Sequence, residues 1–317
     1  MKVRMMFSLF TALFFLFSNS AWAEPSGKLV IFHAGSLSVP FKDISAAFMK
    51  KYPKVKVYRE AAGSRTCARK ITDLDRGADI MASADYTVIN KLMIPEFASW
   101  NIRFASNEMA IVFHHASKGS NDISNTNWHK VLLRKDVIFG RSNPNADPCG
   151  YRAVLTMQLA EKYYGQRGLA KKMTSKNRNY IRPKETDLLA LLESSAIDYI
   201  FLYRSVAEQH GLDFVLLPDE VNLKRPELAQ YYKSASVKIS GKKPGSTITK
   251  RGAPMVYGVT IPKNSPNPEA AMAFMQFLLD ENKGMAVMKK NGQPSMIPAK
   301  SNTYSKIPYQ LKKYALQ

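Results

Sequence analysis

Two acidic residues stand where helices are expected to begin. Asp147 lies in the segment NPNADPCGYR at 143–152, directly before Pro148, and Glu185 lies in RPKETD and opens an expected helix at 185–193. An acidic residue followed by a proline is typical of a helix start. Because helix N-termini present free N–H groups and a positive dipole end, the two segments indicate a site for a small anion.

Neutral hydrogen-bond donors follow two expected strands in the first part of the chain. Gly35 and Ser36 come after a strand at 28–33, and Ser64, with a glycine before it, comes after a strand at 55–58. Glycine allows the main chain to approach a ligand closely, and serine adds a hydroxyl. Taken singly, all of these acidic and hydroxyl residues are also good helix caps, so capping is the alternative interpretation.

Tyr203 is a further candidate, because it ends an expected strand at 199–203 and such a position can direct its hydroxyl into a cleft. An ordinary half-buried tyrosine is the alternative. In open α/β sheets, ligands collect at the carboxyl ends of strands. The candidate residues therefore share one edge of the expected sheets.

The elements that must position these residues alternate between short apolar strands and amphipathic helices, which predicts an α/β fold with a mainly parallel sheet covered on both faces. Extended apolar segments at 109–114 and 255–261 are expected to carry the chain between two lobes. Lobe I would contain residues 24–114 and 252–317, and lobe II residues 115–251. We expect an irregular segment at 165–180 and, at 219–251, a surface loop with a single strand near 236–239.

The amino terminus has the pattern of a secretory signal peptide at residues 1–23. Lys2 and Arg4 precede an apolar run that ends at Phe17, and small residues precede Glu24. The run is too short to span a bilayer, and cleavage is expected after Ala23. No cysteine follows that bond directly, so no lipid anchor is expected. The remaining chain should act outside the cytoplasm, in the periplasm.

The chain is strongly basic, with a formal net charge of +21, or +19 once Lys2 and Arg4 are removed with the signal. Such an excess speeds encounter with anions and also suits nucleic acid or acidic lipids. Export argues against nucleic acid, and the basic residues are scattered rather than gathered in an interaction tail. Electrostatic steering and a merely solvated basic surface both stay open.

No pattern of an enzyme or of a resident metal or cofactor is present. The five histidines lack metal-ligand spacing, and neither a Gly-x-Ser-x-Gly nor a His-Glu-x-x-His motif occurs. The two cysteines, Cys67 and Cys149, can pair in an oxidising compartment, which would join the two sides of the site and restrict its opening. Whether they pair stays open at this point.

Five ordered motifs resemble those of the tungstate/molybdate-binding proteins of ABC importers, in the branch that surrounds the metal oxyanion with protein carboxylates. The similarity extends over residues 28–295. The five motifs are FHAGSL (32–37), ADIMASADY (78–86), NPNADPCGYR (143–152), RPKETD (182–187) and YRSVA (203–207).

The resemblance implies a two-lobed periplasmic-binding-protein fold of type II, with mixed sheets flanked by helices, two crossover strands as a hinge, and a monomeric protein that delivers its ligand to an ABC permease. It also implies which residues bind. The implied ligand-binding residues are Gly35, Ser36, Ser64, Asp147, Glu185 and Tyr203, of which Asp147 and Glu185 would contact the tungsten or molybdenum atom itself.

Two features depart from the pattern of the family. The segment at 165–181 is shorter than an insertion that other members carry, and Arg65 adds a cation beside Ser64 that would moderate selectivity. The preference between tungstate and molybdate therefore stays open. The alternatives are a binding protein of the same fold for sulfate or ferric iron and, more distantly, a secreted hydrolase with Ser36 or Ser64 as its nucleophile.

Overall fold

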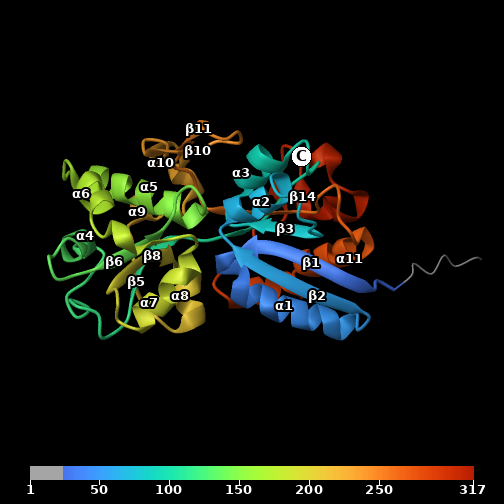
Figure 1. The fold of residues 1–317 in the computed structure, drawn as a ribbon, viewed down its shortest axis with the longest axis horizontal. Coiled ribbons are helices and arrows are strands. Elements are labelled where there is room, and N and C mark those ends of the chain that lie inside the picture. The colour runs from blue at the N-terminus through green and yellow to red at the C-terminus, as the bar shows by residue number, and fades with distance from the viewer. Residues whose placement is uncertain (1–23) are drawn as a thin grey trace, which may run out of the picture.

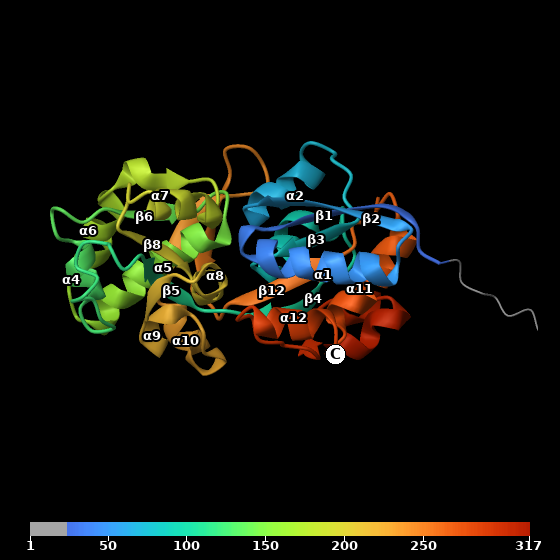
Figure 2. The ribbon, with the colours of Figure 1, turned by 90° about the horizontal axis from the view of Figure 1, so that it is seen from below.

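The computed structural model describes residues 24–317, so the expected signal peptide and its cleavage site at Ala23 lie outside the described residues. The chain forms two lobes side by side, each built on a five-stranded sheet with helices packed around it (Figures 1 and 2). Both sheets mix parallel and antiparallel pairs. The predicted α/β class with mixed sheets is confirmed.

The sheet of lobe I has the strand order β2-β1-β3-β12-β4, in which β12 is antiparallel to both of its neighbours. Its elements are β1 (Gly27–Ala34), α1 (Ser38–Lys51), β2 (Val55–Ala62), α2 (Ser64–Thr72), β3 (Ile80–Ser83), α3 (Tyr86–Val88), β4 (Ile102–Ser106), β12 (Val256–Thr260), α11 (Pro268–Leu279) and α12 (Gly284–Lys290), with a short terminal pair, β13 (Ala299–Lys300) and β14 (Ala315–Leu316).

Alternate side chains of β1 pack on opposite faces of this sheet. Ile31 belongs to the large apolar core together with Phe41 of α1 and Phe274 of α11, whereas Phe32 packs in a smaller cluster with Ile71 of α2. Because neighbouring residues of a strand point to opposite faces, an uninterrupted apolar run places core on both sides. The apolar sequence of β1 thus fixes its place inside a covered sheet (Figure 2).

The sheet of lobe II has the order β7-β6-β8-β5-β9. Helix α5 lies against it and is buried along most of its length. The elements are β5 (Met109–Phe113), α4 (Trp128–Leu132), β6 (Phe139–Ser142), α5 (Pro148–Tyr163), α6 (Leu169–Ser175), β7 (Ile181–Arg182), η4 (Glu185–Leu188), α7 (Leu189–Glu193), β8 (Tyr199–Tyr203), α8 (Arg204–His210), β9 (Asp213–Leu216), α9 (Asp219–Asn222), α10 (Ala229–Tyr232), β10 (Ser236–Ser240) and β11 (Thr247–Arg251).

Two segments are more regular than expected. The stretch at 165–180 contains helix α6, which buries only Leu169 and Met173, so its apolar face is too narrow to be read from the sequence. The expected loop at 219–251 contains two strands rather than one: β10 and β11 form an antiparallel hairpin. Strand β11, TITKR, has no buried residue, and it is therefore formed by its pairing with β10 rather than by an apolar face.

The chain crosses between the sheets at residues 107–108 and 252–255. Strand β5 pairs with β8 and β9 of lobe II, and β12 pairs with β3 and β4 of lobe I. The first crossing thus falls before residue 109, earlier than the expected boundary at 114, because the five residues of β5 are all buried in the second sheet. The apolar segment at 109–114 begins directly after the first crossing, and the segment at 255–261 begins at the last residue of the second.

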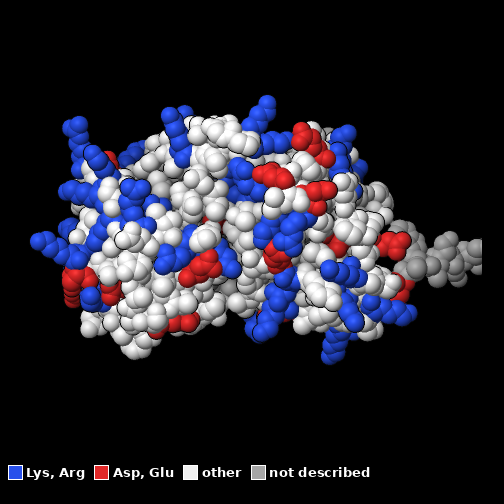
Figure 3. Space-filling model, viewed as in Figure 1, with Lys and Arg blue, Asp and Glu red and all other residues white. Residues whose placement is uncertain are grey.

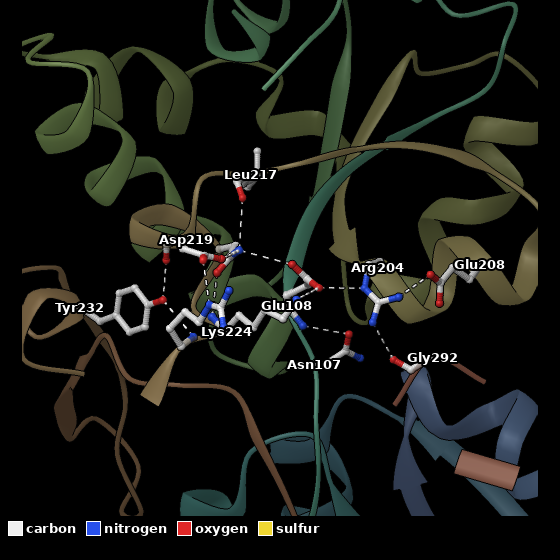
Figure 4. Close-up of polar contacts among 11 residues, drawn as sticks. Asn107, Glu108, Arg204, Glu208, Leu217, Asp219, Lys224, Tyr232 and Gly292 are labelled. Carbon is white, nitrogen blue, oxygen red and sulfur yellow. Dashed lines mark hydrogen bonds and ion pairs between the residues drawn. The ribbon is translucent and has the colours of Figure 1, made fainter. Parts of the chain in front are cut away.

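An ion-pair network around the buried carboxylate of Glu108 lies at the first crossing (Figure 4). Glu108 is 3% exposed, and its Oε1 lies 2.8 Å from Arg204 Nε and 3.0 Å from Lys224 Nζ. Arg204 also donates a hydrogen bond to the carbonyl of Gly292 in lobe I (3.3 Å). The network thereby connects the crossing, lobe II and the C-terminal part of lobe I.

Lysine and arginine side chains are spread over both lobes on the face shown in Figure 3, with acidic residues between them. This scattered arrangement agrees with the dispersed basic residues of the sequence. Among residues 24–317, no helix has the length and apolar character needed to cross a membrane.

Candidate functional site

Asp147 and Glu185 meet between the lobes, although 38 positions separate them in the chain. The main-chain N–H of Glu185 donates to Asp147 Oδ2 (3.1 Å), and both residues are 0% exposed. Asp147 occupies the N-cap position of α5, yet its side chain makes no capping hydrogen bond. The remaining oxygens, Asp147 Oδ1 and Glu185 Oε1 and Oε2, have no hydrogen-bond partner among the described residues.

The pKa values of both carboxyl groups are raised. Burial raises the pKa of Asp147, and burial followed by the charge of Asp147 raises the pKa of Glu185 well above its ordinary 4.5. A buried carboxylate that lacks partners costs free energy, and two of them side by side cost more. The pair can therefore lower this cost either by binding a proton or by donating its free oxygens to an electron-accepting centre.

The short turn Gly35–Leu37 of lobe I, which follows β1, contacts the segment of Glu185. A methyl group placed on Gly35 would lie 3.0 Å from Glu185 Oε1 and 3.1 Å from Oε2, a tight contact that would require the Glu185 side chain to shift slightly. Ser36 is buried beside it, and its hydroxyl accepts a hydrogen bond from Tyr257 Oη (3.0 Å). The structure thus brings Gly35 and Ser36 of lobe I to the acidic pair of lobe II.

Ser64 begins α2 on the same side of the cleft and is 0% exposed. Its hydroxyl accepts a hydrogen bond from the main-chain N–H of Ala84 (3.0 Å). The preceding residue, Gly63, approaches lobe II so closely that a methyl group there would lie 2.4 Å from the carbonyl oxygen of Ala146 and 3.0 Å from Asp147 Cβ. Ser64 therefore lies one residue from the point where the lobes meet.

Tyr203 ends β8 and is fully buried. Its hydroxyl accepts a hydrogen bond from Arg152 Nη1 (2.8 Å), and its ring lies 6.5 Å from that of Tyr257. Since Tyr257 donates to Ser36, Tyr203 is connected to the lobe I side of the site. All six residues expected from the sequence are thus buried around the meeting point of the lobes.

Four neighbours were not singled out from the sequence. Ser142 is buried next to Asp147 with its hydroxyl unpartnered, Arg152 supports Tyr203, and Asn107 Nδ2 donates to Tyr257 Oη (3.0 Å). Ser142 and Arg152 adjoin or lie within the NPNADPCGYR segment, which is the only local signal for them. Tyr257 and Asn107 had none, because they reach the site through tertiary contacts.

The two thiols are not paired. Cys67 and Cys149 are both buried and free, and each points at a main-chain carbonyl: Cys67 Sγ at His33 O (3.4 Å) and Cys149 Sγ at Phe201 O (3.5 Å). No disulfide therefore joins the lobes of this structure. Within residues 24–317, no group of three or more His, Cys, Asp or Glu residues is arranged to hold a metal ion.

The lobes are in contact around the site, as in a closed form. Tyr151 Oη of lobe II donates to Asp85 Oδ2 of lobe I (2.6 Å). The β10–β11 hairpin also reaches lobe I, where Arg69 Nη2 donates to the carbonyl of Gly241 (2.6 Å). The acidic pair is consequently enclosed between two lobes that contact each other on several sides of it.

Comparison with known proteins shows to which family the chain belongs. Residues 29–292 match the family model for bacterial extracellular solute-binding proteins. A solute-binding protein of Petrotoga mobilis is 50% identical over 305 residues, which cover 95% of this chain and 94% of the relative. The molybdate/tungstate-binding protein WtpA of Pyrococcus abyssi is 42% identical over 302 residues, which cover 87% of this chain and 86% of that one.

The fold is also found among solved structures. The periplasmic molybdate-binding protein of Azotobacter vinelandii superposes with a TM-score of 0.62 at 18% identity, covering 84% of this chain and 98% of that chain. At this identity the likeness concerns the fold alone, whereas the similarity to the relatives above extends over nearly the whole sequence. The chain belongs to the family of bacterial extracellular solute-binding proteins.

Proposed function

We propose that this protein captures tungstate or molybdate between its lobes in the periplasm and delivers it to an ABC permease. The observation that carries the proposal is the acidic pair, in which three buried carboxylate oxygens of Asp147 and Glu185 lack partners. The name of the Pyrococcus abyssi relative supports the same ligand class.

The chemistry of the ligand explains why acidic groups suit an anion site. Carboxylates repel an ordinary tetrahedral oxyanion, whose central atom does not accept further oxygen ligands. Tungsten and molybdenum in their hexavalent state are large, hard centres that take additional oxygen donors. Asp147 and Glu185 would thus contact the metal atom and exclude smaller oxyanions at the same time, which is selection by repulsion of the wrong ligand.

The remaining contacts come from both lobes. Gly35, Ser36 and Ser64 would donate hydrogen bonds to the ligand oxygens from lobe I, and Tyr203 would do so from lobe II. A ligand that contacts both lobes favours the closed form by its greater affinity for that form. We further propose that the protein is a monomer, that its lobes are divided at the two crossings, and that it is exported with cleavage after Ala23.

Calorimetric titration with tungstate, molybdate, sulfate and ferric iron tests the proposal. Tungstate or molybdate should bind tightly at one site per chain, and Asp147→Asn and Glu185→Gln should weaken this tight binding by at least about tenfold, the effect of losing a strong charged contact. Glu193→Gln, at an exposed position of α7, is the matched control and should leave affinity unchanged. Unchanged tungstate affinity in both site variants would remove the carboxylate role, and preferential binding of sulfate or ferric iron would identify a different ligand.

A hydrolase is the second candidate, and the contacts at the two serines favour binding over catalysis. Ser36 Oγ accepts a hydrogen bond from Tyr257, and Ser64 Oγ accepts one from the N–H of Ala84. A nucleophilic serine instead needs an adjacent base to take its proton. Turnover of ester or phosphoester substrates that is lost in Ser36→Ala would contradict the binding role.

A further inference from the structure

A cavity of about 280 Å³ lies between the lobes, and neither Asp147 nor Glu185 is among its lining residues. Since water occupies about 30 Å³ per molecule in the liquid, the cavity has room for a small tetrahedral anion with several waters. Both lobes contribute charged side chains to its wall. These are Asp85 and Arg103 from lobe I and Arg152, Lys250 and Arg251 from lobe II.

The one carboxylate of this wall is already neutralised. Asp85 forms an ion pair with Lys250 and accepts a hydrogen bond from Tyr151 Oη (2.6 Å). Burial by itself would raise the pKa of the Asp85 carboxyl, but the positive charges of Lys250 and Arg152 outweigh it and hold that pKa well below its ordinary value. The charge that remains to face the cavity comes from the three arginines.

Arg152 is the most informative of the three. It is 4% exposed, and within the described residues its side chain makes a single hydrogen bond, from Nη1 to the neutral hydroxyl of Tyr203 (2.8 Å). Within residues 24–317, no carboxylate forms an ion pair with it. Asp85 acts on the charge of Arg152 but is already paired directly with Lys250, so a bound oxyanion would supply the direct partner that the buried guanidinium lacks.

Arg103 faces the same space from β4 of lobe I. Its guanidinium lies over the ring of Tyr86, 4.0 Å from the centroid, and the side chain is half-buried. It likewise has no ion-pair partner in the described part of the chain. Arg251, on β11, also lines the cavity; it is exposed and donates a hydrogen bond to the carbonyl of Lys233 (3.5 Å).

We propose that this cavity is a second, outer oxyanion site, which takes a small tetrahedral dianion such as sulfate through guanidinium hydrogen bonds from both lobes. Planar guanidinium groups match the oxygen pairs of such anions in geometry. Because the described lining offers no carboxylate other than the paired Asp85, this site needs no metal atom in its ligand. It is therefore less selective than the acidic pair.

The outer site follows from the positions of Arg103 and Arg152 on opposite lobes. An anion held by both attracts the lobes to each other and favours the closed form. Arg152 also touches Tyr203, so it stands between the outer cavity and the acidic pair. This inference goes beyond the proposed function and does not depend on it.

Titration of the tungstate-loaded protein with sulfate tests the proposal, because tungstate first fills the acidic pair. We expect one sulfate per chain to bind in the millimolar range, and Arg103→Gln to weaken sulfate binding about tenfold while leaving tungstate affinity within about twofold. Arg167→Gln, at an exposed arginine of lobe II, removes the same charge away from the cavity and should leave sulfate binding unchanged. Crystals soaked in tungstate should show a second tungsten peak between Arg103 and Arg152.

Two results would overturn the outer site. One is the absence of any bound sulfate at millimolar concentration, and the other is an equal loss in the Arg103→Gln and Arg167→Gln variants, which would mean only a general charge effect. Sulfate binding to the tungstate-free protein separates this proposal from the function proposed above. If sulfate binds through Arg103 but tungstate does not bind at all, the outer site stands and the proposed function fails.

Discussion

Gly63 of lobe I lies so close to Ala146 of lobe II that no side chain fits between them. A methyl group on Gly63 would lie 2.4 Å from the carbonyl oxygen of Ala146. The N–H of Thr66 donates to the same carbonyl (3.3 Å). Because Gly63 has φ −56, its identity is explained by this close approach rather than by its main-chain conformation. The contact exists only when the lobes are closed.

Gly63→Ala should therefore oppose closure without removing any group from the ligand site. Overpacking of this kind costs about 1–3 kcal/mol, so the apparent affinity for tungstate should fall about tenfold. Calorimetry measures the affinity, and small-angle scattering with ligand present should show a larger fraction of open molecules. Gly77→Ala is the control, since its methyl group would meet the ring of Pro266 in the same lobe, at 3.3 Å from Cγ, and no atom of lobe II. Normal closure in Gly63→Ala would contradict this account.

The acidic pair should make both stability and binding depend on pH. A carboxyl group whose pKa is raised in the folded state stabilises that state below its unfolded value of 4.5, and this contribution is lost as pH rises through the raised pKa of Glu185. The melting temperature of the ligand-free protein should thus fall, relative to that of Glu185→Gln, as pH increases above 4.5. A difference in melting temperature between the two proteins that does not change with pH would show that the pKa of Glu185 is not raised.

Tungstate affinity should change in the opposite direction over the same range. Rising pH removes the proton from the pair and frees its oxygens to contact the metal, so binding should strengthen until the pair is ionised. Titrations at a series of pH values measure this dependence, which Glu185→Gln should flatten. A wild-type affinity that is independent of pH would contradict it.

Tyr257 should position Ser36 rather than contact the ligand. Its hydroxyl receives a hydrogen bond from Asn107 Nδ2 and donates one to Ser36 Oγ, both at 3.0 Å. Tyr257→Phe should weaken tungstate binding about fivefold, the value of roughly 1 kcal/mol for one hydrogen bond. Tyr232→Phe removes a buried hydroxyl that donates to Asp219 within lobe II and should leave affinity unchanged. Equal affinity in the two variants would deny Tyr257 this role.

Glu108 should stabilise the fold at the first crossing. Glu108→Ala would leave Arg204 and Lys224 without their buried partner and should lower the free energy of unfolding by about 3 kcal/mol. Glu208 also pairs with Arg204 but is more exposed, so Glu208→Ala should cost less than about 1 kcal/mol. Urea denaturation compares the two, and an equal loss would mean that burial at the crossing adds nothing.

Local pattern was sufficient for most elements of the sheets. The apolar run at β1 predicted a strand, and the apolar residues at helical spacing in α1 predicted a helix. Both predictions succeeded because the side chains that must be buried follow the period of the element. It was insufficient for α6, which buries only Leu169 and Met173, and for β11, which buries nothing. In such segments contacts with a neighbouring element, β10 for β11 and α5 for α6, determine the conformation more than the segment's own residues do.

The sequence by itself determined that Asp147 and Glu185 stand at helix starts, and the resemblance it carries placed them in one site with Gly35, Ser36, Ser64 and Tyr203. Only the tertiary structure decided how they meet. From the sequence, Asp147 could equally well be an N-cap whose side chain bonds to its own helix. Its carboxylate instead accepts a hydrogen bond from the N–H of Glu185, and three oxygens of the pair have no partner among the described residues. That choice depends on the docking of η4 beside α5 and on the closing of lobe I over both, and contacts between segments so distant in the chain leave no periodic trace in the sequence.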